Sequence, residues 1–200
     1  MSVEWNWTGA RWWKLDFHTH TPESDCYGKG PDQEVLKQRK PKEWLLDYMR
    51  VGLDCVVVTD HNTGAWIDNL KKALDELKAE NHSDYRMLYL FPGVEISVNG
   101  GIHVLAILPM SKGTSDIDTL LGAVGFGGEK GKTNHATTKS PLEVINEIIN
   151  AGGLAIPAHV DETNGLFKLS GTTLQQVLKC EHIIAMEQCN PSTQKPQLYL

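Results

Sequence analysis

Hydrophobic and polar positions alternate in blocks along the chain, and the blocks predict strands and helices in turn. Apolar runs with the length of strands lie at 13–17, 54–59, 87–91, 102–108, 154–158 and 183–187. Between most of these runs, apolar residues recur at helical spacing, around 44–49, 66–77, 142–149 and 174–178. This order of elements predicts an α/β fold in which the ends of several strands meet at one mouth.

The alternation breaks after Glu95, because only seven residues separate this glutamate from His103. A parallel crossover needs a dozen or more residues, so the two runs are expected to form an antiparallel hairpin. If the turn centres on Asn99, Glu95 and His103 are cross-strand neighbours with Cβ atoms about 5 Å apart. That separation suits two ligands of one metal ion.

Local signals mark the helix starts and the loops. Ser140-Pro141-Leu142-Glu143 combines a Ser cap, a Pro in the first turn and a Glu three residues on. Residues 115–118 predict a second capping box, with Ser115 as the cap. The Gly- and Pro-rich segments 21–40 and 122–139 are expected to be surface loops, the second of them an insertion.

Composition narrows the class of protein. A chain of 200 residues predicts one domain, with 1–12 as an N-terminal lead-in and 13–200 as the folded unit. The net charge of −6 argues against a basic face that coats duplex nucleic acid, although bound divalent cations would supply positive charge locally. Four cysteines without a C-x-x-C pair, no signal peptide and no long apolar run predict a cytoplasmic protein with no membrane association.

The candidate chemistry lies where predicted strands end. In Asp16-Phe17-His18-Thr19-His20 an extended chain places both imidazoles on one face, with Asp16 able to accept a ring N–H. The full set of candidate metal ligands is His18, His20, Asp25, His61, Glu95, His103 and His159. These are too many donors for one tetrahedral zinc. They predict a multinuclear site in which Glu95 bridges two ions that activate water for an in-line displacement at phosphorus.

Each candidate also has a structural explanation. A single histidine near a strand is more often hydrogen-bonded than metal-bound, and Asp60 would equally cap the helix that follows it. Three loop lysines are candidate phosphate ligands, although solvated loop charges are the commoner case: Lys29, Lys130 and Lys132. The remaining histidines, His82, His135 and His182, are expected to lie outside the site.

Four ordered motifs resemble those of the PHP (polymerase and histidinol phosphatase) superfamily. They are Asp16–His20 with Asp25, Thr59-Asp60-His61-Asn62, Gly93-Val94-Glu95 followed by His103, and Pro157-Ala158-His159. A fifth segment, Ala185-Met186-Glu187-Gln188-Cys189-Asn190, is similar to another strand of that family. The surrounding sequence is most similar to PHP domains at the N-terminus of large bacterial SMC-like ATPases.

The resemblance implies a distorted (β/α)7 TIM-like barrel with two or three divalent ions (Zn, Mn or Fe) and phosphoesterase activity. By it, His18 and His20 hold one ion, Glu95 bridges to a second held by His103 and His159, and Asp25 and His61 serve a third. Glu95, His103 and His159 are the candidate catalytic residues, and Asp16 and Asp60 support the ligands. The expected substrate is a phosphate ester, most often a phosphodiester of nucleic acid, attacked by a metal-bound hydroxide.

One departure from the family leaves alternatives open. The family adds ligands from an Asp-x-His motif after the last matched strand, and no such motif precedes Leu200. We therefore expect a barrel truncated at its C-terminus, whose missing ligands lie further along a chain that continues into the ATPase. The alternatives are a catalytically incomplete module that regulates or docks the ATPase and, less well supported, an amidohydrolase.

Overall fold

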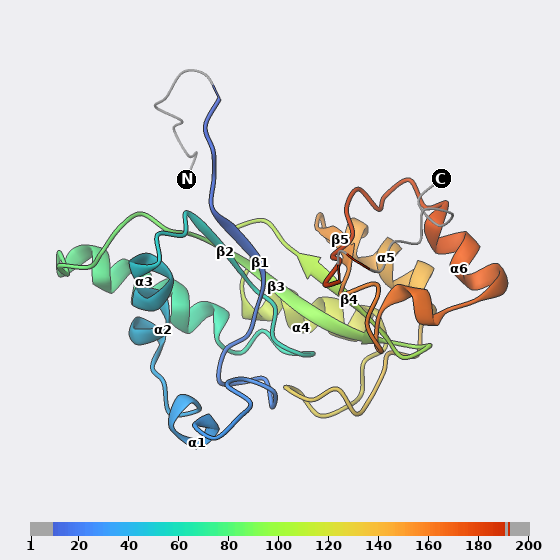
Figure 1. Ribbon diagram of the computed structural model, residues 1–200, viewed down its shortest axis with the longest axis horizontal. Coiled ribbons are helices and arrows are strands. Elements are labelled where there is room, and N and C mark those ends of the chain that lie inside the picture. Colours follow the sequence, from blue (N-terminus) through green and yellow to red (C-terminus); the bar gives the residue numbers. More distant parts are fainter. Residues whose placement is uncertain (1–9, 191, 193–200) are drawn as a thin grey trace.

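The computed structural model describes residues 10–190 and 192, and its centre is one curled sheet of five strands (Figure 1). The strands are β1 (Leu15–Thr19), β2 (Cys55–Val58), β3 (Tyr89–Val98), β4 (Ile102–Ile107) and β5 (Leu154–Pro157), in that spatial order. β1, β2 and β3 are parallel, whereas β3, β4 and β5 are antiparallel neighbours. Over the described residues the sheet is an open half-barrel with β1 and β5 at its edges, and the seven-stranded barrel is not confirmed.

Strand β3 changes partner along its length, and this change curls the sheet. Its first residues, up to Pro92, pair with β2, and those from Gly93 onward pair with β4. A Cβ on Gly93 would lie 2.7 Å from the backbone oxygen of Ala106 and 3.0 Å from that of Val58. Only glycine lets three strand backbones approach so closely at this point.

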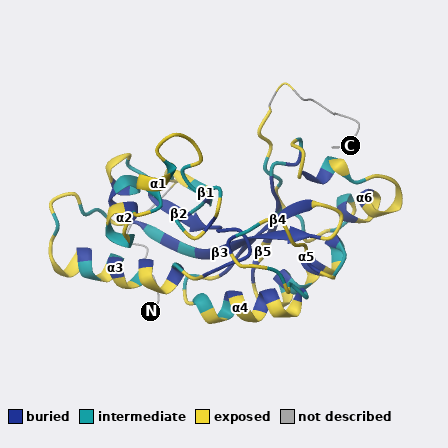
Figure 2. Cartoon of the chain, turned by 90° about the horizontal axis from the view of Figure 1, so that it is seen from below, coloured by how far each residue is buried: buried dark blue, intermediate teal, exposed yellow. Residues whose placement is uncertain are grey.

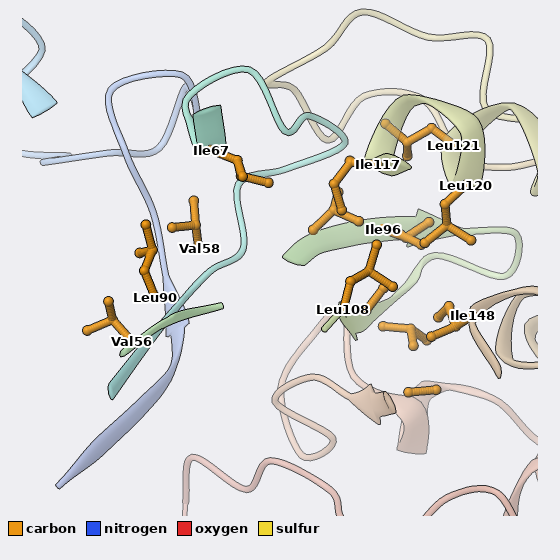
Figure 3. Packing of buried hydrophobic residues seen from close by; sticks show 14 of the residues in the cluster. Val56, Val58, Ile67, Leu90, Ile96, Leu108, Ile117, Leu120, Leu121 and Ile148 are labelled. Carbon is orange, nitrogen blue, oxygen red and sulfur yellow. The ribbon is translucent and has the colours of Figure 1, made fainter. Parts of the chain in front are cut away.

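In the part of the chain that the structure describes, five of the six α-helices bury apolar side chains in the core, and the short first helix has no buried residue. The helices are α1 (Gln33–Leu36), α2 (Pro41–Arg50), α3 (Ile67–Ala79), α4 (Thr114–Ala123), α5 (Pro141–Asn150) and α6 (Gly171–Leu178), with a 3₁₀ turn at Leu166–Lys168. Exposed residues follow the outer faces of α3 and α4, and the central strands β2, β3 and β4 are almost wholly buried (Figure 2). Buried side chains from Val56 and Leu90 to Ile148 form one continuous core (Figure 3). No helix of the described residues is long and apolar enough to cross a membrane.

The two predicted helix caps have different outcomes. The Ser140 cap of α5 is confirmed, because the Ser140 hydroxyl accepts from the Glu143 N–H and the Glu143 carboxylate accepts from the Ser140 N–H. The Ser115 cap of α4 is wrong. The helix begins at Thr114, and the carboxylate of Asp116 reaches back three residues to accept the Gly113 N–H at 2.9 Å.

The predicted hairpin of β3 and β4 is confirmed, but its register is shifted. Gly100 and Gly101 both have positive φ, +102° and +76°, so the turn centres on Gly100 rather than Asn99. Val98 therefore pairs with Ile102, and His103 lies opposite Ser97, not opposite Glu95. Glu95 and His103 are instead diagonal neighbours on one face of the sheet, which still leaves their side chains within reach of each other.

Three segments differ from expectation. The predicted strand 183–187 is not a strand, because only two backbone hydrogen bonds tie Glu187 to the end of β5: its N–H donates to Pro157 and its oxygen accepts from Val160. The loop 21–40 contains the short helix α1. The 122–139 segment is largely exposed, as expected, but it is also tied to the site, since the Gly131 N–H donates to the His61 oxygen and Thr137 is buried. The tryptophans of the lead-in before residue 10 lie outside the described residues.

Candidate metal centre

Five imidazoles converge on the carboxylate of Glu95, which is 1% exposed at the middle of β3. Two of them contact Oε1 of Glu95: His103 Nδ1 at 2.6 Å and His159 Nε2 at 3.0 Å. The other three approach Oε2: His61 Nδ1 at 2.9 Å, His18 Nε2 at 3.0 Å and His20 Nε2 at 3.5 Å. The imidazoles come from β1 and the residue after it, from the loop after β2, from β4, and from the residues after β5. Side chains spread over most of the chain therefore meet at one carboxylate.

Backbone pairing beyond the strand ends fixes this arrangement. His61 follows β2 and forms an isolated parallel bridge with Glu95, so the Glu95 N–H donates to Asp60 and the Asn62 N–H donates to Glu95. His159 has a φ of +29°, an uncommon backbone conformation for a residue with a side chain. Its N–H donates to Glu187 Oε2 at 2.8 Å, which holds the strained residue in place.

Burial and the Glu95 charge have opposite effects on the imidazoles. Burial lowers the pKa of His18, but hydrogen bonds to Glu187 and Glu95 outweigh it and raise that pKa to about 10. Burial likewise opposes the contacts with Cys26 and Glu95 that raise the pKa of His61 to about 10. For His20 burial dominates and lowers the pKa to about 4.

The carboxylate itself stays ionised. Burial would raise the pKa of Glu95, but close contacts with the imidazole nitrogens of His103, His159, His18 and His61 hold that pKa far below the usual range. A buried carboxylate is stable only with partners, and here each partner is an imidazole that takes up either a proton or a metal ion. The net charge of the centre therefore depends on how many of its imidazole nitrogens bind protons or metal ions.

The donor set fits divalent first-row metal ions. Three groups of donor atoms each lie within 4.8 Å of one another: His20, Cys26 and His61; His18, His20 and Glu95; and His61, Glu95 and His103. Imidazole, carboxylate and thiolate are the ligands that zinc and its neighbours prefer. In addition, Nδ1 of His61 and Nδ1 of His159 are buried without a hydrogen bond of acceptable geometry, a cost that a metal–nitrogen bond would remove.

Two other acidic candidates, Asp25 and Asp60, lie outside the three groups of donor atoms. Asp25 is exposed at the rim and belongs to none of the three donor groups. Asp60 is fully buried and accepts from the Thr21 N–H and hydroxyl and from the Ser24 hydroxyl, 2.6–2.7 Å away, while its Oδ1 lies 4.0 Å from His20 Nδ1. It therefore holds the turn after His20 rather than capping a helix.

The carboxylate beside the His18 ring is not the expected one. Asp16 accepts from the backbone N–H of His18 at 3.2 Å, and the ring Nδ1 lies 2.8 Å from Glu187 Oε2. Glu187 and Cys26 are the two site residues that the sequence reasoning missed. Cys26 adjoins the candidate Asp25, and Glu187 lies in a segment noted only for its resemblance to a family strand.

A cavity of about 550 Å³ opens onto this centre. Its lining residues are His18, His20, Asp25, Cys26, Lys29, Gln33, His61, Glu95, His103, Thr133, His159 and Asn164. Of the three candidate lysines only Lys29 lines it. Lys130 forms an ion pair with Asp118 at 2.5 Å and Lys132 one with Glu129 at 2.8 Å. His82, His135 and His182 are not among the lining residues, as expected.

Comparison with known proteins yields likenesses of structure at low sequence identity. No protein-family model matches the chain, and no curated protein matches its sequence. A protein from Bifidobacterium adolescentis assigned as a metal-dependent phosphoesterase superposes with a TM-score of 0.55 and 19% identity, over 93% of this chain and 82% of the other. An amidohydrolase from Chromobacterium violaceum, with bound sulfate and no metal, gives a TM-score of 0.51 and 16% identity, over 86% and 76% of the two chains.

Endonuclease Q, in complex with a 27-mer duplex that carries an abasic lesion at the active site, gives a TM-score of 0.50 and 18% identity, over 79% of this chain and 38% of the other. At these identities the likenesses show a shared fold. The fold thus occurs in hydrolases that act on different bonds, and the chemistry of this chain has to be argued from its own residues.

Proposed function

We propose that this protein is a metal-dependent hydrolase of phosphate esters that belongs to the PHP superfamily. The observation that supports it best is the Glu95 carboxylate surrounded by five imidazoles at the floor of an open, polar cavity. Bound divalent ions would supply a strong nucleophile from water at neutral pH and would stabilise the attacking and leaving oxygens at phosphorus. We further propose two or three such ions per chain, from among zinc, manganese and iron.

The chain's own residues have separate roles in this proposal. Glu95 would bridge ions, His103 and His159 would complete the central donors, and His18, His20 and His61 would hold further ions with Asp25 or Cys26. Asp60 positions the turn that carries His20 and Ser24. Lys29 lines the cavity and would orient the phosphate group of the substrate.

Nucleic-acid phosphodiesters remain our first proposal for the substrate, within a cytoplasmic protein. The distorted (β/α)7 barrel and the link to an SMC-like ATPase, which rest on the sequence resemblance, complete the proposal. Support for a nuclease is limited to the fold shared with Endonuclease Q. The salt bridges of Lys130 and Lys132 mean that the described rim offers few unpaired cations to a nucleic-acid backbone.

Metal content and hydrolysis test the proposal together. Protein purified without chelator is expected to carry first-row ions and to hydrolyse a generic phosphodiester or monoester, bis-p-nitrophenyl or p-nitrophenyl phosphate. Glu95→Gln should lose most of both properties, because a neutral amide cannot bridge cations. The matched control, Glu80→Gln, changes an exposed glutamate on the outer side of the molecule and should lose neither.

A metal-loaded protein that is inert on both esters would contradict the enzymatic proposal and favour the docking module. The amidohydrolase reading has one supporting observation, the fold shared with the Chromobacterium violaceum enzyme. Hydrolysis of p-nitroacetanilide in preference to the phosphate esters would favour that reading instead. The two hydrolase classes are therefore separated by the same preparation of protein.

A further inference from the structure

Cys26 lies within the metal centre, although no carboxylate or histidine motif includes it. Its Sγ, with one nitrogen each of His20 and His61, forms a group of donor atoms that all lie within 4.8 Å of one another. The thiol is partly buried and lines the cavity. Among the described residues the other three cysteines, Cys55, Cys180 and Cys189, belong to no such group.

The turn that carries Cys26 is held rigidly from within. Successive hydrogen bonds link the Ser24 N–H to Thr21, the Tyr27 N–H to Ser24 and the Lys29 N–H to Cys26, at 3.0–3.1 Å. Such a series fixes the backbone on both sides of the cysteine. The thiol is therefore pre-positioned rather than carried by a loose loop.

Side chains from outside the turn fasten it further. The Gln33 amide donates to the backbone oxygens of Asp25 and Tyr27, at 2.9 and 3.0 Å. The Lys37 ammonium donates to those of Pro22 and Ser24. A partly buried ammonium group and a side-chain amide thus hold the backbone on either side of Cys26 in place.

His61 gives an independent indication of a ligand at this place. Its side chain is 8% exposed, and its Nδ1 is buried without a hydrogen bond of acceptable geometry. The ring faces His20, with ring centroids 4.7 Å apart, and contacts Cys26. His61 Nδ1 lies 2.9 Å from Glu95 Oε2, so the ring joins the Glu95 carboxylate to the thiol and the second imidazole. A buried imidazole between a carboxylate, a thiol and another imidazole matches the sulfur, nitrogen and oxygen donors of zinc sites.

We propose that Cys26, with His20 and His61, forms a thiolate subsite of the metal centre that selects Zn²⁺ over Mn²⁺. Thiolate is a soft ligand that favours zinc over manganese, whereas carboxylate and water are hard ligands that suit manganese and magnesium. If Asp25 were the third donor in place of Cys26, the subsite would lack a soft ligand and would favour zinc less strongly. The thiolate of Cys26 thus decides which metal ion the subsite prefers. This proposal concerns the same metal centre as the proposed hydrolase, but it does not require that the protein hydrolyse a substrate.

The test uses the whole 200-residue chain, freed of metal with a chelator, and Co²⁺ as a spectroscopic probe. Cobalt bound to a thiolate gives a sulfur-to-metal charge-transfer band in the near ultraviolet, and cobalt bound to nitrogen and oxygen does not. The band is expected in the parent protein and in Asp25→Asn, and it should be absent from Cys26→Ser. Cys180→Ser is the matched control, a partly buried cysteine outside the centre, and should keep the band.

Affinities for Zn²⁺ and Mn²⁺, measured by competition with a chromophoric chelator, give the selectivity. Loss of a supporting contact already costs about 10–100-fold in metal affinity, so loss of the sulfur itself should weaken Zn²⁺ binding at least about tenfold. Mn²⁺ binding should change little, so the preference for zinc should shrink. A preference that is unchanged in Cys26→Ser, or that is lost in Asp25→Asn instead, would overturn the proposal.

A measurement on the unmodified protein guards against a variant that fails to fold. Zn²⁺ in excess of three equivalents should protect Cys26 from alkylation, followed by mass spectrometry, while exposed Cys189 reacts as before. Equal alkylation of Cys26 with and without zinc would overturn the proposal. Protection and the cobalt band in a protein that hydrolyses no substrate would instead contradict the proposed function and leave the thiolate subsite standing.

Discussion

At the scale of single residues, Glu187 shows how a carboxylate outside the ligand set can control it. Its Oε2 lies 2.8 Å from Nδ1 of His18 and accepts the N–H of His159 at 2.8 Å, so one oxygen contacts two candidate ligands. A carboxylate on the far nitrogen of an imidazole fixes which nitrogen faces the metal and strengthens that nitrogen as a donor. Glu187 is thus a positioning residue for the centre.

Replacing this carboxylate should weaken metal binding much more than it weakens the fold. We expect Glu187→Ala to lower the affinity for Zn²⁺ by about 10–100-fold, measured by chelator competition. Glu187→Gln keeps an oxygen that can accept both hydrogen bonds and should fall between parent and alanine variant. Glu181→Ala, an exposed glutamate of the same segment, is the control. Equal affinities for all four proteins would contradict the positioning role.

The predictable part of the centre consists of residues whose role follows from their local position. His18 lies on β1 and His20 directly follows it, while His61 and His159 follow β2 and β5, so the order of strands brings all four to one end of the sheet. Glu187 was not predictable, because its contact with His18 joins residues 169 positions apart through a segment that is not a strand. Cys26 was not predictable because its side-chain direction depends on the series of turns after Thr21.

At the scale of elements, the exchange of partners along β3 depends on Gly93. A methyl group there would contact the backbone oxygens of Ala106 and Val58, which belong to strands on opposite sides. Backbone atoms in a paired sheet cannot move aside as a flexible side chain can. The close approach at Gly93 therefore sets the curl that carries Glu95 towards the histidines.

We expect Gly93→Ala to lower the free energy of unfolding by about 1–3 kcal/mol, measured by urea denaturation, because overpacking forces backbone shifts. Metal affinity should fall in parallel, since Glu95 lies two residues further along the strand. Gly122→Ala is the control, because Gly122 lies in helix α4 with no atom near its added Cβ. That change should be neutral or stabilising by up to about 1 kcal/mol. A Gly93→Ala protein as stable as the parent would refute the close-approach argument.

Elements with strong local signals were predicted well from the sequence. Helix α2 begins at Pro41, as expected, and α3 and α5 follow the predicted apolar stripes. The hairpin was found from loop length, but its register depends on which glycines adopt positive φ, and the sequence Asn99-Gly100-Gly101 allows more than one choice. The run at 183–187 has the composition of a strand, yet strand formation needs a partner edge, which the described residues do not complete.

At the scale of the whole molecule, the centre joins the two ends of the half-barrel. β1 and β2 supply His18, His20 and His61, β4 and β5 supply His103 and His159, and Glu95 lies on the strand between them. One hydrophobic core includes residues of both parts, among them Val56 on β2 and Ile148 on α5 (Figure 3). Ions held from both sides would therefore stabilise the fold as a unit, by an amount that follows their concentration and affinity.

Protons bound by the imidazoles around Glu95 should also make the stability of the metal-free protein depend on pH. The ordinary pKa of histidine is 6.5, and those of His18 and His61 in the fold are about 10. From pH 6.5 to about 10 the folded chain binds protons that the unfolded chain has released, so stability falls as pH rises. The pKa of His20 is about 4, so between pH 6.5 and about 4 the unfolded chain binds a proton that the folded chain refuses, and stability falls as pH drops.

The metal-free protein should accordingly be most stable near pH 6.5. Bound zinc should oppose the loss of stability above that pH. Metal binding requires deprotonated imidazoles, so the increase in melting temperature caused by Zn²⁺ should grow from about pH 6.5 to about pH 8.5. Scanning calorimetry of the metal-free and zinc-loaded proteins across this range measures both trends. His182→Gln, at an exposed position outside the centre, should leave both trends unchanged, whereas His18→Gln should flatten the metal-free decline above pH 6.5. A metal-free protein that grows more stable above pH 6.5 would show that protons do not occupy the imidazoles around Glu95.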